Sequence, residues 1–335
     1  PPYVTTVAPR SGTYDEGMPA RETFEIGGTQ VPITHPDKVV FDEIGLTKLD
    51  LMQYYAAVAD GALRGVRDRP MILKRFVKGI GQEAIFQKRA PANRPDFVSV
   101  AELKYASGTS AKEAVLHDAA GLIWAVNLGC VDLNPHPVRA DDLDHPDELR
   151  VDLDPMPDAS WADVRRVAGV VHEVLDELGA TGFPKTSGGS GLHVYVRIPP
   201  DHGFADVRRA AHAFAREVER RCDRVDLSWW RKDRDPSTVF VDYNQNARDH
   251  TIACAYSVRG TPDARVSAPV AWDEIDDCEP RDFTIATVPA RYAELGDLHA
   301  GIDEAVFGIE PLLEWADRDE RDGAETPDLP DLDGG

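Results

Sequence analysis

Acidic residues at the ends of short apolar segments are the first candidates for chemistry in this sequence. Asp152 and Asp154 stand in the run Val-Asp-Leu-Asp-Pro, and Asp242 follows the apolar run Val-Phe-Val. Residues i and i+2 of a strand point to the same face, so we expect Asp152 and Asp154 to lie side by side. Neighbouring carboxylates repel each other unless a cation lies between them, and oxygen ligands favour hard cations such as Mg²⁺ or Mn²⁺. A solvated acidic strand end is the simpler alternative for either motif alone.

A glycine-rich segment with two hydroxyl residues is the second candidate. Residues 186–193 read Thr-Ser-Gly-Gly-Ser-Gly-Leu-His and lead into an expected strand at 192–198. Glycines allow backbone N–H groups to approach a phosphate closely, so this loop is a candidate phosphate contact. It is not a P-loop, because no Gly-Lys-Ser/Thr sequence follows. A plain glycine-rich connection, with His193 as a structural histidine, is the alternative.

The charge of the chain is strongly negative but unevenly distributed. The 335 residues include 59 acidic and 37 basic ones, for a net charge of −22. Among the charged residues of 64–112, basic ones are nevertheless in the majority. Among those of 141–158 and of the last twenty residues, acidic ones are in the majority. The net charge argues against a nucleic-acid-binding protein, but the basic stretch allows DNA binding over a limited footprint. Apolar runs of the ~18–20 residues that span a bilayer are absent, and the first residues do not resemble a signal peptide, which predicts a cytoplasmic protein.

The order of expected elements predicts an α+β protein, because helices and strands alternate without strict βαβ repeats. Helices are expected at 47–61, 109–126, 160–179 and 204–221. Strands are expected at 71–77, 97–103, 129–133, 149–153, 192–198, 238–243 and 251–258. Thr47 with Asp50, and Ser160 with Asp163, have the spacing of helix-capping residues.

The chain is expected to contain one folded domain between two extensions. Residues 1–30 show no periodicity and predict an extended lead, and residues 316–335 are too polar and acidic to fold alone. The folded domain is therefore expected at 31–315. The four cysteines form no Cys-x-x-Cys pair, so the sequence predicts neither a zinc ribbon nor a disulfide framework.

The succession of three motifs resembles the archaeo-eukaryotic primase superfamily. Asp-x-Asp comes first, Ser-Gly-Gly-x-Gly-Leu-His second, and a strand ending in Asp-Tyr-Asn-Gln-Asn third. Within that superfamily the chain is similar to the polymerase domain of bacterial ATP-dependent DNA ligase D, over roughly residues 31–310. Further matching segments are Thr34-His35-Pro36-Asp37-Lys38-Val39, Gly45-Leu46-Thr47-Lys48, Leu73-Lys74-Arg75 and Tyr256-Ser257-Val258-Arg259-Gly260. We expect a stand-alone relative, because the chain is short for a ligase and has no Lys-x-Asp-Gly motif.

The resemblance implies a primase-polymerase fold with an RRM-like, antiparallel or mixed sheet flanked by helices. It implies an enzyme that adds rNTPs or dNTPs to DNA primer ends and short gaps during DNA repair and end joining. By this likeness Asp152, Asp154 and Asp242 hold two divalent ions, Mn²⁺ or Mg²⁺, for in-line phosphoryl transfer. The implied partners are a primer–template with a 5′-phosphorylated gap or break, nucleoside triphosphates, and, as candidates, Ku and a separate DNA ligase. A monomer is expected.

The same resemblance assigns further binding residues. The residues that match nucleotide contacts are Lys74, Ser187, His193, Gln245 and Arg259. The residues that match DNA contacts are Lys38, Lys48, Arg75, Phe86 and Arg234. Among these, Lys38 and Lys48 correspond to lysines that grip a 5′-phosphate, and Phe86 corresponds to an aromatic residue that stacks on a base. Surface lysines and a core phenylalanine are the alternatives.

Four departures from the family pattern concern substrate binding rather than the metal site. Relatives usually have Lys where this chain has Ser190, and many have His, Asn and an aromatic residue at the positions of Asn134, His35 and Ile85. His136 is a candidate substitute for the missing histidine. Other functions fit the same residues: a primer-independent primase or a two-metal nuclease that uses the same carboxylates, and a non-catalytic DNA-end-binding repair module.

Overall fold

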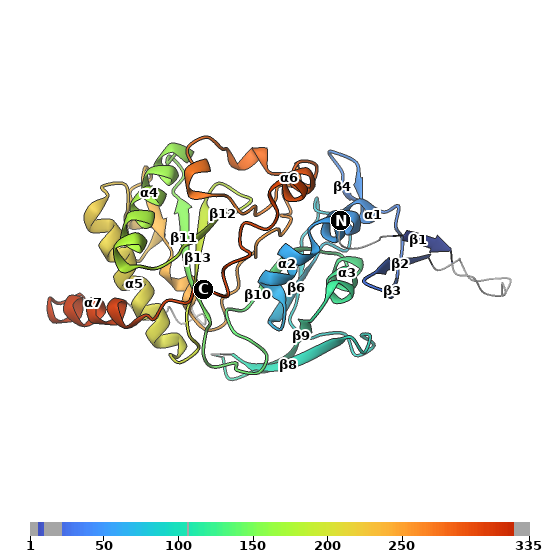
Figure 1. The fold of residues 1–335 in the computed structure, drawn as a ribbon, viewed down its shortest axis with the longest axis horizontal. Coiled ribbons are helices and arrows are strands. Elements are labelled where there is room, and N and C mark those ends of the chain that lie inside the picture. Colours follow the sequence, from blue (N-terminus) through green and yellow to red (C-terminus); the bar gives the residue numbers. More distant parts are fainter. Residues whose placement is uncertain (1–5, 10–21, 106, 325–335) are drawn as a thin grey trace. The chain divides into compact units, whose positions relative to one another are not determined.

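The computed structural model describes residues 6–9, 22–105 and 107–324, and the chain divides into two units (Figure 1). Unit 1 consists of Pro1–His136, Thr251–Ala268 and Arg281–Ala300. Unit 2 consists of Pro137–His250, Pro269–Pro280 and Gly301–Gly335. None of the helices that the structure describes is long and apolar enough to cross a membrane.

Unit 2 has the β-α-β-β-α-β order of a ferredoxin-like or RRM-like fold. Its elements are β11 (Glu148–Pro155), α4 (Trp161–Leu178), β12 (Phe183–Thr186), β13 (Leu192–Arg197), α5 (Phe204–Arg221) and β14 (Val239–Val241). The four strands form one antiparallel sheet in the order β12-β13-β11-β14. The expected RRM-like sheet of an α+β protein is therefore confirmed, with β11 in an interior position.

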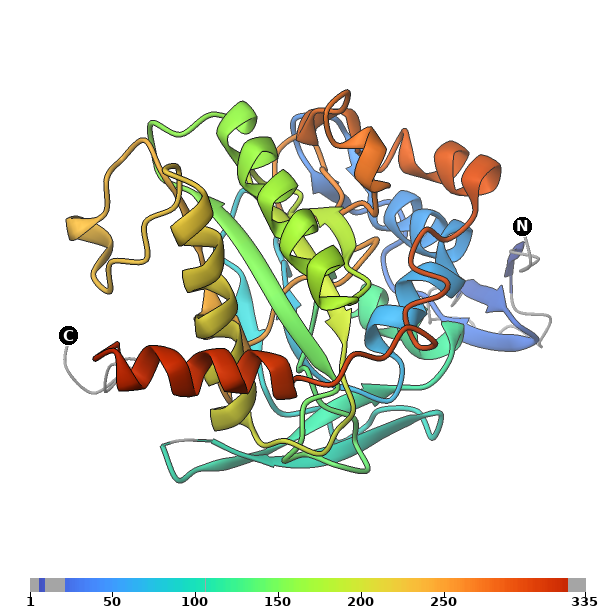
Figure 2. The ribbon, with the colours of Figure 1, turned by 60° about the vertical axis from the view of Figure 1, so that its left-hand side comes forward.

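Helix α4 covers this sheet because its sequence specifies both its ends and its apolar face. Ser160 and Asp163 form the expected capping box, and Gly179 ends the helix with a left-handed φ of 68°. The buried positions of the helix recur at helical spacing: Val164, Val167, Ala168, Val171, Val174 and Leu175. Helices α4 and α5 both contact β11 and contact each other. Figure 2 shows them, in green and gold, beside the long strand β11.

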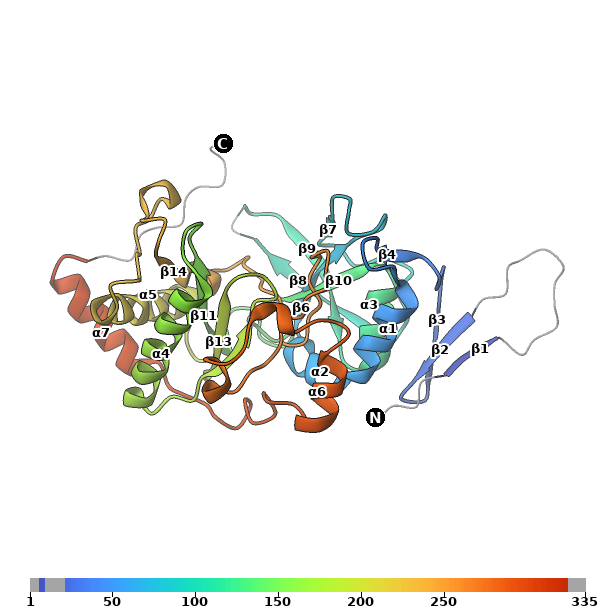
Figure 3. The ribbon, with the colours of Figure 1, turned by 90° about the horizontal axis from the view of Figure 1, so that it is seen from above.

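Unit 1 is built on a second antiparallel sheet, of five strands. These are β6 (Pro70–Arg75), β7 (Ile85–Gln87), β8 (Val98–Lys104), β9 (Ser110–Leu116) and β10 (Cys130–Pro135), in the order β10-β6-β9-β8 with β7 also paired to β6. Helices α1 (Lys48–Ala57), α2 (Ala59–Val66) and α3 (Ala119–Asn127) contact one another, and α2 and α3 contact β10. Figure 3 shows α1 next to α3. Smaller elements are the pair β4 (Val39–Phe41) and β5 (Leu46–Thr47), and helix α6 (Val288–Leu295).

Three expected elements differ from the structure. The helix expected at 109–126 is strand β9 followed by helix α3, because the apolar run that ends at Leu116 fits a strand paired with β8 and Asp118 caps a new helix. The strand expected at 251–258 is not a ladder strand: Tyr256 has a φ of 62°, and only Val258 forms an isolated bridge. The helix expected from residue 47 is divided at Val58 into α1 and α2.

Both expected extensions also need correction. Residues 22–32 are not an extended lead, because β2 (Glu22–Ile26) and β3 (Thr29–Pro32) form an antiparallel hairpin, joined by β1 (Thr6–Pro9). The buried side chains of Phe24, Ile26 and Val31 explain why this hairpin is ordered. The boundary expected at residue 316 lies inside helix α7 (Glu310–Arg321), and residues 325–335 lie outside the described part of the chain.

Helix α7 is held to α5 by ion pairs between acidic and arginine side chains. Asp319 is 2% exposed, and its carboxylate contacts Arg216 and Arg220 on α5. Arg209 contacts Glu320 in the same interface. The acidic side chains that predicted a disordered tail are therefore paired, on α7, with arginines of helix α5.

We expect Asp319→Asn to lower the free energy of unfolding by about 1–2 kcal/mol, because half-exposed arginines lose a buried partner. Burial alone would raise the pKa of Asp319, but hydrogen bonds from Arg220 and Arg318 lower it. The stabilisation is therefore present above the ordinary Asp value of 3.8 and is lost as the pH falls below it. Urea unfolding at pH 7 and pH 3.5 measures both effects, with the exposed Asp317→Asn as control. Equal stability of Asp319→Asn and wild type at pH 7 would contradict this expectation.

Candidate metal centre and substrate-binding residues

The structure brings the three carboxylates of the sequence motifs together where β14 pairs with the end of β11. Asp152 and Asp154 lie on β11, and Asp242 directly follows β14, which pairs with the end of β11. The backbone N–H of Asp242 donates to the carbonyl oxygen of Asp152 at 2.8 Å, which fixes the two segments next to each other. One oxygen atom from each of the three carboxylates lies within 4.8 Å of the other two. These carboxylates are therefore close enough to share a cation.

The segment after Asp242 holds this carboxylate in place. The backbone N–H of Asn244 donates to Asp242 Oδ1 at 2.9 Å, and the amide of Gln245 contacts Asp242 Oδ2 at 3.3 Å. The buried side chain of Asn246 accepts from the N–H of Arg150 and donates to its carbonyl oxygen, both at 2.8 Å. Asn246 thus ties the segment that follows Asp242 to the backbone of β11.

The donor set fits a hard divalent cation. Three carboxylates at this spacing supply only oxygen ligands, which favour Mg²⁺ or Mn²⁺ over softer metals. Without a cation they would repel one another, and burial of Asp152 to 4% exposure increases that cost. Asp152, Asp154 and Asp242 are therefore the residues that would hold such ions.

His193 lies beside the acidic group and is oriented by a buried lysine. Its Nε2 is 3.3 Å from Asp152 Oδ1, and its Nδ1 is 2.6 Å from the Nζ of Lys185. Lys185 is completely buried and also lies over the ring of Tyr195. When the Nζ of Lys185 donates to Nδ1, the hydrogen of the neutral imidazole is on Nε2. This arrangement directs an N–H group of His193 toward the carboxylates.

The glycine-rich loop is organised by the hydroxyl of Ser187. Its Oγ accepts hydrogen bonds from the N–H groups of Gly189 and Gly191, at 3.0 and 3.1 Å. These two N–H groups donate within the loop. They are therefore not the backbone groups that we expected from the sequence to contact a phosphate. A Cβ atom at Gly191 would lie 2.3 Å from the carbonyl oxygen of Leu153, between the two aspartates of β11. Only glycine allows the loop to pack this closely on the acidic strand.

Two expected nucleotide contacts of unit 1 converge on one buried acid that the sequence did not suggest. Lys74 Nζ lies 2.7 Å from Asp132 Oδ2, and Arg259 Nε lies 3.4 Å from the same atom. Lys74 is on β6 and Asp132 is its partner on β10. Together these residues form a cationic pair over a buried carboxylate.

The two lysines expected at a 5′-phosphate belong to one cationic group in unit 1. Lys48 is largely buried and donates to the carbonyl oxygens of Thr34 and Asn127. Lys38 donates to the carbonyl oxygen of Val77. Burial, together with the charges of Lys38 and Arg75, lowers the pKa of Lys48 to about 8. Such an excess of positive charge suits an anionic ligand.

The other expected DNA contacts differ in how accessible they are. Phe86 is 65% exposed, so the alternative of a core residue is wrong. Arg75 is tied to the carbonyl oxygen of Leu128 and to Gln87. Arg234 of unit 2 donates to the carbonyl oxygens of Ser228 and Trp229 and lies over the ring of Phe240. Its guanidinium supports a loop, and its role in binding DNA stays a prediction.

The departures from the family pattern can be placed in the structure. His136 is buried and its Nε2 lies 3.0 Å from Glu113 Oε2, so it is occupied within the core of unit 1 rather than offered to a nucleotide. Asn134 lies on β10 two residues after Asp132. Ile85 is half-exposed next to Phe86.

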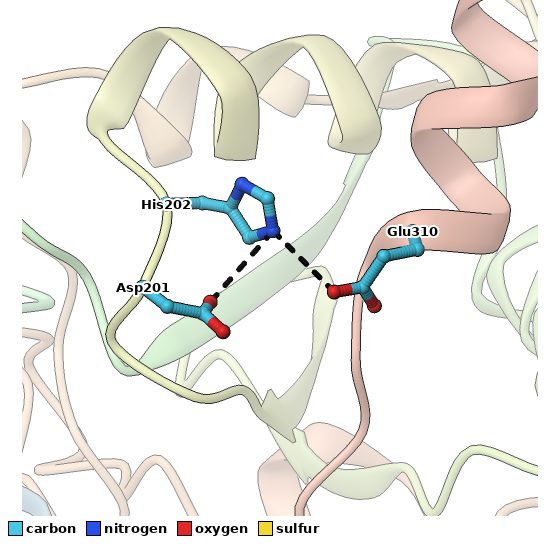
Figure 4. A group of neighbouring side chains, drawn as sticks. All are labelled: Asp201, His202 and Glu310. Atoms are coloured by element: carbon cyan, nitrogen blue, oxygen red, sulfur yellow. Dashed lines mark ion pairs between the residues drawn. The ribbon is translucent and has the colours of Figure 1, made fainter.

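A second group of potential metal ligands lies elsewhere in unit 2. Figure 4 shows the ring of His202 between Asp201 and Glu310, with its Nε2 at 3.7 and 3.6 Å from their carboxylate oxygens. Asp201 and Glu310 are exposed, and such surface groups are common without a bound ion. This group is an ion-pair cluster between the start of α5 and the start of α7.

Comparison with known proteins settles the family. The family description "LigD, primase-polymerase domain" matches residues 47–299. This chain belongs to the LigD primase-polymerase domain family.

Curated relatives are larger proteins. The multifunctional non-homologous end joining DNA repair protein LigD of Mycobacterium tuberculosis is 30% identical over 315 residues, which cover 89% of this chain and 40% of the relative. The LigD protein of Pseudomonas aeruginosa is 32% identical over 268 residues, which cover 79% of this chain and 32% of the relative. The chain thus spans well under half the length of these LigD proteins.

A solved structure supports the same family. The polymerase domain of Mycobacterium tuberculosis ligase D, in complex with DNA, matches with a TM-score of 0.76 and 29% identity. The match covers 82% of this chain and 98% of that domain. The likeness to a LigD polymerase domain confirms both the recognised family and the α+β primase-polymerase fold.

Sequence reasoning did not identify Asp132, Lys185 or Asn246. Asp132 contacts Lys74 and Arg259, Lys185 contacts His193, and Asn246 binds the backbone of β11 at Arg150. Asp132 and Lys185 are polar residues within strands, at Val-Asp-Leu and Phe-Pro-Lys-Thr, and Asn246 is the last residue of the motif Asp-Tyr-Asn-Gln-Asn. A polar residue at a buried position needs a partner, and that signal marks them as candidates. Which partner each one has depends on pairing between distant strands.

Asp242→Asn should weaken Mn²⁺ binding about tenfold or more, because one of three carboxylates then loses its charge. Titration of the protein with Mn²⁺, followed by electron paramagnetic resonance of the free ion, measures this directly. Asp201→Asn is the matched control, since it removes the same charge from the exposed group of Figure 4 and should leave the tight binding unchanged. Unchanged affinity in Asp242→Asn, or a loss confined to Asp201→Asn, would refute the assignment.

Proposed function

We propose that this chain is a metal-dependent nucleotidyltransferase that adds rNTPs or dNTPs to the 3′ ends of DNA primers at breaks and short gaps. The observation that carries the proposal is the convergence of Asp152, Asp154 and Asp242 within 4.8 Å, beside His193. Membership in the LigD primase-polymerase family supports the reaction class. In this role the chain acts in non-homologous end joining, in the cytoplasm at the nucleoid, with Ku and a separate DNA ligase as proposed partners.

The proposed site residues divide the work between holding ions and holding the triphosphate. Two divalent ions bound at the three aspartates, Mn²⁺ or Mg²⁺, would activate the primer hydroxyl and neutralise the leaving pyrophosphate. His193 directs its Nε2–H toward the same place, and Lys185 keeps it in that tautomer. Lys74, Ser187, Gln245 and Arg259 are the other proposed nucleotide contacts. Positioning and charge neutralisation therefore supply most of the rate enhancement.

The proposed DNA contacts are cationic and aromatic. Lys38 and Lys48 bind a 5′-phosphate at the downstream side of a gap, and Arg75 and Arg234 contact the backbone. Phe86 exposes its ring for stacking on a base. Phosphate contacts of this kind make the affinity fall with increasing salt.

Asp152→Asn should reduce primer extension by about a hundredfold or more, because the most buried ligand loses its charge. The assay uses a primer–template with a 5′-phosphorylated gap, Mn²⁺, and either NTPs or dNTPs, with Asp201→Asn as the control that retains activity. Equal extension by Asp152→Asn and wild type would contradict the proposed site. Products from a bare single-stranded template would instead favour a primase, and a shortened primer would favour a nuclease. Binding of DNA ends without any product would favour a non-catalytic module.

The preference for a 5′-phosphorylated gap should fall several-fold as the pH rises through about 8. Lys48 is protonated below its pKa of about 8 and loses the charge that binds the phosphate above it. Fluorescence anisotropy of labelled gapped DNA, with and without the 5′-phosphate, measures the ratio of affinities from pH 7 to pH 9.5. Lys48→Arg should keep the ratio constant over this range, because arginine stays protonated. A constant ratio in the wild type would remove Lys48 from the phosphate site.

A further inference from the structure

Asp132 is a buried carboxylate beneath the cationic side chains of Lys74 and Arg259 in unit 1. Its side chain has no exposed surface, whereas those of Lys74 and Arg259 are 21% and 29% exposed. Both cations contact the same atom, Asp132 Oδ2, at 2.7 and 3.4 Å. One buried oxygen thus holds two like charges close together at the surface, where they would otherwise repel each other.

The strand register places this group in one row of side chains. Asp132 on β10 is the partner of Lys74 on β6, and Lys74 is the partner of Phe86 on β7. A register shift between Cys130 and Asp132 is of the kind that re-aims a side chain. The Nζ of Lys74 also lies 5.3 Å from the ring centroid of Phe76 and 5.8 Å from that of Phe86. The lysine is therefore bounded by an acid and two rings.

The hydroxyl of Tyr55 links the backbone segments that carry Asp132 and Arg259. The hydroxyl of Tyr55 donates to the carbonyl oxygen of Val131 and accepts from the N–H of Val258, at 2.5 and 2.9 Å. Burial raises the pKa of Tyr55 well above its ordinary value, so the hydroxyl keeps the proton that it donates. These contacts join the residues that precede Asp132 and Arg259 in the chain.

The same face of β10 contains two buried polar atoms that have no hydrogen-bond partner among the described residues, Asp132 Oδ1 and Asn134 Nδ2. A buried carboxylate with one oxygen unpaired is costly, and a buried ion pair is by itself weak evidence of stabilisation. The acid is thus poorly explained as a stabilising element alone. Its position beneath two surface cations indicates a role in what those cations bind.

We propose that Asp132 is a positioning residue that holds Lys74 and Arg259 as a fork for the triphosphate of the incoming nucleotide. The inference rests on the proposed function in one respect, the assignment of a triphosphate to this pair. Asp132 does not touch the nucleotide. It sets the separation of the two cations, so that both can contact an anion without first being ordered.

Asp132→Asn should raise the KM for nucleotide about tenfold in the gap-extension assay, with a smaller change in kcat. It should also weaken the binding of inorganic tripolyphosphate, measured by calorimetry without divalent metal, by a similar factor. The asparagine keeps the shape of the side chain but removes the charge that restrains both cations. The matched control is Glu113→Gln, which neutralises another buried carboxylate of the same sheet, paired with His136 and Tyr105. The control should leave both quantities within twofold of wild type, whatever stability it loses.

A double-mutant cycle separates positioning from a general structural effect. In a Lys74→Met, Arg259→Met background, Asp132→Asn should change the affinity for tripolyphosphate less than twofold, because the groups through which it acts are gone. The same tenfold loss in that background would overturn the proposal. Tighter binding of tripolyphosphate by the Asp132→Asn single variant would also overturn it, since net charge would then outweigh geometry.

The affinity for tripolyphosphate and the primer-extension activity test the fork and the proposed function separately. If the wild type binds tripolyphosphate about tenfold more tightly than Asp132→Asn but extends no primer, the polymerase is refuted and the fork is retained. A wild type that extends primers, with KM and tripolyphosphate affinity both unchanged in Asp132→Asn, would refute the fork and retain the polymerase.

Discussion

The mutual repulsion of three carboxylates is the constraint on which the arrangement of unit 2 depends. Asp152 and Asp154 share a face of β11, and Asp242 is brought to them by a hydrogen bond between backbone atoms. The surrounding structure keeps these carboxylates in place. Asn246 binds the backbone of β11, and Gly191 allows the glycine-rich loop to pack closely against the same strand. A cation bound among the three carboxylates would replace this repulsion with attraction.

Each unit fixes its exposed or reactive charges by means of a buried partner. In unit 2, Lys185 is fully buried and orients His193 toward the carboxylates. In unit 1, Asp132 is fully buried and restrains Lys74 and Arg259. Such partners add little net stability, because burying them offsets much of their attraction. Their value lies in reducing the freedom of the groups that are proposed to bind substrate.

The sequence predicts most of what depends on local pattern, and less of what depends on pairing between distant segments. The i, i+2 spacing of Asp152 and Asp154 and the capping box of α4 could be read directly. The partners Lys185 and Asp132 could not, because their role appears only when strands are paired. The strand at Ser110–Leu116 was expected to be helical, since a short apolar run suits both periods and only pairing with β8 decides. Helix α7 was not expected, because the sequence near Asp319 is acidic. The ion pairs that hold this helix involve arginines of α5, far away in the sequence.

The central claim is that Asp152, Asp154 and Asp242 hold divalent ions for nucleotidyl transfer. Anomalous X-ray diffraction from crystals soaked with Mn²⁺ and a non-hydrolysable nucleoside triphosphate tests it most directly. The account predicts two Mn²⁺ peaks within coordination distance of these carboxylates, with triphosphate oxygens as further ligands. Crystals in which Mn²⁺ and the triphosphate bind only elsewhere, with these three carboxylates uncoordinated, would contradict it.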